Sequence, residues 1–67
     1  MTIRIKFATG TESARAICAN LLGGAASSIR MFDHGGVISA DVTIGASSYE
    51  AARAELRVNP MVVWFHR

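Results

Sequence analysis

The chain has 67 residues, of which 51% are hydrophobic, with one cysteine and a formal net charge of +2 at pH 7. This length predicts a single domain over residues 1–67 with a small core, because so short a chain buries only roughly 60% of the surface that it exposes when unfolded. The composition excludes an internal disulfide, and we expect neither a signal peptide nor a membrane span, since no apolar run approaches the ~20 residues that cross a bilayer.

Residues 2–7 alternate polar and apolar side chains without a break. A period of two is typical of a strand that is buried on one side only. The three apolar side chains therefore share the buried face, and Arg4 and Lys6 lie on the opposite, open face. The rest of the chain is expected to complete a sheet around this strand.

A helix is predicted over residues 10–22. Thr9 and Glu12 have the spacing of a capping box, in which a hydroxyl and a carboxylate each accept a hydrogen bond from a free N–H group. Gly23 and Gly24 end the helix, since glycine adopts the left-handed conformation at no steric cost. Apolar residues at helical spacing form one stripe for the core: Ala14, Ile17, Cys18, Leu21 and Leu22.

Two further strands are predicted over residues 28–33 and 37–44. The segment His34-Gly35-Gly36 between them reads as a tight turn, in which glycine supplies the positive φ that a hairpin needs. The alternation in this region places one set of side chains on the same face as Arg4: Arg30, Phe32, His34, Ser39, Asp41 and Thr43.

The second helix is predicted over residues 48–58. Ser47 and Glu50 repeat the capping-box spacing. The helix is expected to end at Asn59-Pro60, because the residue before a proline is pushed out of the helical region. Its buried stripe contains three residues: Tyr49, Ala52 and Leu56.

Residues 61–66 are predicted to form the last strand, with Val62, Trp64 and His66 on the open face. The element order is then β-α-β-β-α-β, an α+β fold. Right-handed crossovers and the central hairpin favour a four-stranded antiparallel sheet in the order 4-1-3-2, with both helices on one face. This topology resembles the ferredoxin-like (split βαβ) architecture over the whole chain. So many functions share that fold that the resemblance implies none in particular.

The predicted open face combines large aromatic side chains with cations. Exposed aromatics on a small domain mark binding surfaces, since they bury much area at little entropic cost. The alternative is that the aromatics only pack over the aliphatic stems of neighbouring strands. The predicted partner-binding set has six members: Arg4, Lys6, Arg30, Phe32, Trp64 and His66.

The first functional hypothesis is a small protein-interaction module. It is an inhibitor or adaptor of the kind that phages and mobile elements encode, and it acts through the open face or an edge strand. Phe32 and Trp64 are its anchors, and its cations select an acidic partner. Self-association through the same face is compatible with this hypothesis, because an isologous dimer covers the apolar patch.

The second hypothesis is a single-stranded nucleic-acid binder that uses the same face. RNA-recognition domains share the topology and stack bases on aromatics of the two central strands. Here the central strands carry Arg4, Lys6, Ser39 and Asp41 instead, and the aromatic signature of those domains is absent. A carboxylate in the middle of the sheet also repels phosphate, so this hypothesis ranks second.

The third hypothesis places a small anion or nucleotide on the loop of Thr9, Gly10 and Thr11, where free N–H groups at a helix start attract negative charge. Helix capping explains this loop more simply. The loop has neither the glycine pattern nor the lysine of a phosphate-binding P-loop.

The sequence contains no catalytic constellation, so we expect a non-enzyme without a cofactor. Cys18 lies on the buried helical stripe and is expected to be an inert small hydrophobe. A lone cysteine favours a reducing, cytoplasmic compartment. His34 and His66 are placed on opposite sheet edges, about 14 Å apart, which is too far to share a metal ion.

Overall fold

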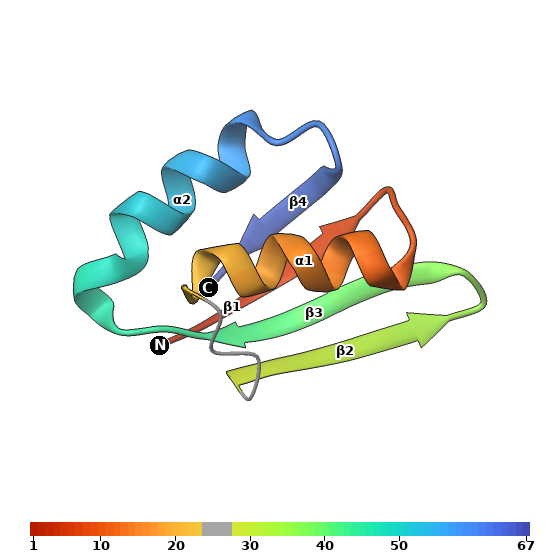
Figure 1. The fold of residues 1–67 in the computed structure, drawn as a ribbon, viewed down its shortest axis with the longest axis horizontal. Helices are drawn as coiled ribbons and strands as arrows, with labels where there is room; N and C mark the ends of the chain where they lie inside the picture. The colour runs from red at the N-terminus through yellow and green to blue at the C-terminus, as the bar shows by residue number, and fades with distance from the viewer. Residues whose placement is uncertain (24–27) are drawn as a thin grey trace.

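Figure 1 shows a computed structural model of the protein, which describes residues 1–23 and 28–67. The α+β character predicted from the sequence is confirmed. The elements in chain order are β1 (Thr2–Phe7), α1 (Thr11–Leu21), β2 (Ile29–His34), β3 (Val37–Thr43), the 3-10 turn η2 (Ala46–Ser48), α2 (Tyr49–Val58) and β4 (Val62–His66).

The four strands form one antiparallel sheet in the order β2-β3-β1-β4. Read from the β4 edge, this order is 4-1-3-2. Strands β1 and β3 are central, and β2 and β4 are the edges. Both helices contribute to a single core with the same side of β1, so they cover one face of the sheet (Figure 1). The arrangement is compatible with the ferredoxin-like layout.

The core lies between the sheet and the two helices, and it confirms the alternation predicted for β1. Within the described residues, three of the four buried helical side chains are small: Ala14, Cys18 and Ala52. Among the residues that the structure describes, Leu56 of α2 is the one large helical side chain that is buried in this core. The buried core residues are Ile3, Ile5, Phe7, Ala14, Cys18, Ile38, Ala40, Val42, Ile44, Ala52 and Leu56.

Both predicted capping boxes are wrong. The N-cap of α1 is Gly10, whose carbonyl oxygen accepts a hydrogen bond from Ala14 N at 3.0 Å. The N-cap of α2 is Ser48, at the end of η2. Neither helix has a side-chain capping bond, because each begins one residue later than the box spacing requires.

The predicted helix ends agree with the structure where it describes them. Gly23, which follows the C-cap residue Leu22 of α1, has φ +64°, whereas Gly24 lies outside the described residues. After α2 the backbone of Asn59 becomes extended, with φ −82° and ψ 117°, ahead of Pro60. The side-chain oxygen of Asn59 then accepts a hydrogen bond from Met61 N at 2.9 Å, which holds the turn into β4.

The β2–β3 hairpin closes with the two-glycine turn predicted from the sequence. His34 pairs with Val37, and the two residues between them have φ values of +62° and +91°. Asp33 Oδ1 accepts a hydrogen bond from Gly36 N at 3.0 Å and fixes the turn. This tight connection keeps β2 and β3 in register along their whole length.

Strand β4 pairs with β1 through a bulge. Trp64 pairs with Lys6 and Val62 pairs with Phe7, so Val63 is an extra residue between them. One extra residue reverses the face of all side chains that precede it. Val62 therefore packs against the core, and the prediction that it lies on the open face is wrong.

Candidate binding surface

Strand pairing aligns side chains in two rows that cross the sheet, and we keep the term open face for the surface that these rows form. Residues directly opposite each other in antiparallel strands share a face, so each row lies on one surface. All six predicted partner-binding residues lie in the two rows. The first row is Phe32, Ser39, Lys6 and Trp64, and the second is Arg30, Asp41, Arg4 and His66.

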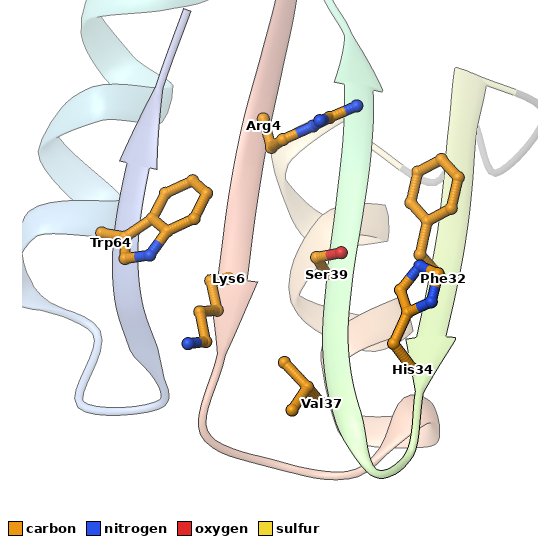
Figure 2. Close-up of a pocket in the computed structure, with 7 residues that line it drawn as sticks. All are labelled: Arg4, Lys6, Phe32, His34, Val37, Ser39 and Trp64. Carbon is orange, nitrogen blue, oxygen red and sulfur yellow. The ribbon is translucent and has the colours of Figure 1, made fainter.

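The first row lines a shallow hollow of about 390 Å³ (Figure 2). Phe32 lies on its β2 side and Trp64 on its β4 side, with Lys6 and Ser39 between them. The edge strands are three strand spacings apart, which puts the two aromatic sides about 14 Å from each other. The hollow has the volume of a small ligand site, but it is shallow and open to solvent, as a protein-docking surface is.

Three residues of this hollow are absent from the predicted partner-binding set: His34, Val37 and Ser39. His34 and Val37 flank the glycine turn of the hairpin. The alternation of β2 and β3 already places them on the face of Phe32 and Ser39, so the sequence carried the signal. The sequence did not reveal that the residues on both sides of the hairpin turn line the hollow.

Arg4 and Asp41 form a two-pronged ion pair on the open face. Arg4 Nε donates to Asp41 Oδ1 at 2.8 Å, and Nη2 donates to Oδ2 at 2.9 Å. The hydrogen bond from Arg4 lowers the pKa of Asp41, with smaller contributions from the charges of Arg30 and His66. Arg4 therefore offsets the one carboxylate of the open face, and its guanidinium is already engaged.

Phe32 is half-buried by its neighbours rather than by the core. The guanidinium carbons of Arg4 and Arg30 each lie 5.8 Å from its ring centroid. The ring of His34 stacks on it, with centroids 6.4 Å apart. Phe32 therefore agrees in part with the alternative that the aromatics only pack against neighbouring side chains, because its ring already contacts two guanidinium groups and an imidazole.

Trp64 remains the most accessible aromatic of the open face, with 41% of its surface exposed. Its ring stacks on that of His66 at a centroid distance of 5.0 Å and an angle of 18°. It is not among the hydrophobic residues that pack against the core. Trp64 therefore presents apolar area to the outside without contributing to the interior.

The positive charge of the chain is concentrated on the open face. Three cations, Arg4, Lys6 and Arg30, stand there against the single carboxylate of Asp41, an excess of two that equals the net charge of the whole chain. The two helices are balanced, because three arginines and three glutamates occur on them: Arg15, Arg53, Arg57, Glu12, Glu50 and Glu55.

The loop of the third hypothesis lies apart from the hollow. Gly10 is the N-cap of α1, and none of Thr9, Gly10 and Thr11 lines the hollow. Among the described residues the loop carries no cation. It therefore offers an anion only the free N–H groups of the first helical turn.

Cys18 is fully buried, as predicted, and burial raises the pKa of its thiol to about 11. His34 and His66 lie on the opposite edge strands β2 and β4. Within residues 1–23 and 28–67, no three acidic, histidine or cysteine side chains gather in a way that suits a metal ion.

Comparisons of the chain with protein-family models, curated proteins and solved structures give no significant match. No helix in the part of the chain that the structure describes is long and apolar enough to cross a membrane.

Proposed function

We propose that this chain is a non-catalytic binding module whose open face docks an acidic protein partner, in the manner of an inhibitor or adaptor of a larger assembly. The observation that carries the proposal is the concentration of net positive charge on a sheet face that also exposes Trp64. Charge selects and orients an acidic partner, and an exposed aromatic that the partner buries supplies much of the binding energy.

Single-stranded nucleic acid is the second candidate for the same face. In its favour, Arg4 offsets the charge of Asp41, which reduces the repulsion of phosphate. Against it, stacked bases need open ring faces. The ring of Trp64 is already stacked on His66, and the two central strands carry no aromatic side chain on this face. A protein partner is therefore favoured.

The direct test is affinity capture from the native host with three forms of the protein. Trp64→Ala is expected to lose the partner, because truncation of an aromatic anchor typically costs about 2 kcal/mol or more of binding free energy. Val58→Ala is the matched control, since Val58 is 81% exposed but belongs to α2. Equal capture by Trp64→Ala and wild type contradicts the proposal, provided that the melting temperatures agree.

A second pair of variants separates the open face from the β4 edge. Val37 and Val63 are 47% and 54% exposed, and only Val37 lines the hollow. Val37→Glu is expected to weaken the captured complex by about tenfold, because it places a like charge opposite an acidic partner. Val63→Glu is expected to leave the dissociation constant unchanged. The reverse pattern assigns binding to strand addition at β4.

A further inference from the structure

Lys6 is a half-buried cation in the middle of the first row, between Ser39 on β3 and Trp64 on β4. Among the described residues it forms no ion pair and no side-chain hydrogen bond. A lysine of this kind buries its aliphatic stem and keeps its ammonium at the surface, where the charge is available to a ligand. Such a group suits a site that an anion completes.

The neighbouring cations are less available than Lys6. Arg4 directs two N–H groups to Asp41, and Figure 2 shows its side chain extending from β1 across β3. Arg30 lies over the ring of Phe32 at the edge of the sheet. Lys6 is therefore the cation of the hollow that faces an incoming ligand without a competing carboxylate.

We infer that Lys6 binds a carboxylate of the partner, from an Asp or Glu side chain on a short extended peptide segment. This inference deepens the proposed function and depends on it. Ser39 lies opposite Lys6 on the adjoining strand, and in Figure 2 its hydroxyl points toward Phe32 whereas the Lys6 ammonium points toward β4, so Lys6 is the donor that holds the carboxylate. Trp64 and Val37 line the same hollow, and their apolar surface reduces the screening of the ion pair (Figure 2).

The dimensions of the hollow define the segment. An extended chain rises about 3.3 Å per residue, so about four residues cross the ~14 Å between the two edge strands. Alternate side chains of that segment point toward the sheet. A central acidic residue then lies on Lys6, and apolar residues two positions away contact Trp64 and Phe32.

One peptide pair tests the inference directly. The probes are the blocked peptide Leu-Ser-Glu-Ser-Leu and the same peptide with Gln in place of Glu. Trp64 is the only tryptophan of the chain, so its fluorescence reports binding at the hollow. We expect the Glu peptide to change Trp64 emission, and we expect the Gln peptide to bind roughly tenfold more weakly, as for a lost hydrogen bond to a charged group.

Three proteins are titrated with both peptides. Lys6→Gln is expected to weaken binding of the Glu peptide by the same factor of roughly ten and to leave binding of the Gln peptide unchanged. Arg53→Gln is the control, because Arg53 is an exposed cation of α2. Melting temperatures provide the second readout: a purely structural Lys6 predicts that Lys6→Gln unfolds earlier, whereas a binding residue predicts an unchanged or higher melting temperature.

Several results overturn the inference. They are no emission change at millimolar peptide, equal affinity for the Glu and Gln peptides, and equal effects of Lys6→Gln and Arg53→Gln. Oligothymidylate that binds more tightly than the Glu peptide, with loss in Lys6→Gln, assigns Lys6 to phosphate instead. If Lys6→Gln still captures the partner while Trp64→Ala does not, the proposed function stands and the inference that Lys6 binds a carboxylate is wrong.

Discussion

Arg4 and Lys6 are two residues apart on the same face of the same strand, yet only Arg4 forms an ion pair within the described residues. The planar guanidinium of Arg4 matches the two oxygens of Asp41, which a single ammonium group cannot do. Lys6 is opposite Ser39 and Trp64 and has no carboxylate to pair with among the described residues. The difference follows from strand register, which decides the neighbours of each side chain.

Cys18 gives a prediction of pH dependence. Burial raises the pKa of its thiol from 9.0 to about 11, so ionisation of the thiol favours the unfolded chain. This stabilisation is fully present below pH 9 and is lost as the pH rises toward 11. Between pH 8 and pH 10.5 we expect the unfolding free energy of wild type to fall by on the order of 1–2 kcal/mol more than that of Cys18→Ala.

Urea unfolding of both proteins at the two pH values measures the difference. The substitution itself lowers stability at both pH values by deleting buried volume, so only the change with pH is diagnostic. Parallel losses in wild type and Cys18→Ala show that the thiolate is tolerated in the folded state, and contradict the assignment.

At the scale of elements, the hairpin between β2 and β3 depends on its two glycines. Gly36 has φ +91°, which L residues with a side chain rarely adopt. Gly36→Ala is expected to lower the unfolding free energy by about 1–2 kcal/mol. Gly45→Ala is the control, because Gly45 has φ −70° and its added Cβ meets only Ser47 Oγ at 3.9 Å.

The control substitution is expected to be neutral or to stabilise by up to about 1 kcal/mol, because alanine restricts the unfolded chain. Thermal or urea unfolding measures both variants. Equal stabilities for Gly36→Ala and Gly45→Ala are incompatible with a turn that requires positive φ at this position.

The elements themselves were predictable from the sequence, and their exact starts were not. Periodicity of two and of 3.6 located the strands and helices, because burial on one face imposes it. Capping failed at Thr9 and Ser47 because each helix begins one residue later, at Gly10 and Ser48, where no Glu or Gln follows three positions on. The box spacing therefore did not locate the helix starts.

The candidate site was predictable to a similar degree. Alternation placed all six row members of strands β1 to β3 on the correct face, because the pairing among these strands contains no irregularity. Alternation failed at Val62, where a run of five apolar residues from Met61 to Phe65 hides the bulge. The engagement of Arg4 by Asp41 and the unpaired state of Lys6 required the register, which only the structure provides.

At the scale of the whole molecule, the two sides of the sheet are chemically separate. One side holds the core under helices whose charges balance, and the other carries the net positive charge of the chain. The open face contains no core residue, so substitutions on it are expected to change binding with little change in stability. This separation is what allows the binding proposal to be tested independently of folding.

The central claim is that the open face recognises acidic protein chains. Its most direct test is a titration of the ¹⁵N-labelled chain with poly-L-glutamate at low ionic strength, followed by amide and tryptophan indole shifts. We expect the shifts to concentrate on Lys6, Ser39 and Trp64 and to disappear as salt is added. Shifts concentrated on α1 and α2, or spread evenly over both sides of the sheet, would contradict the claim.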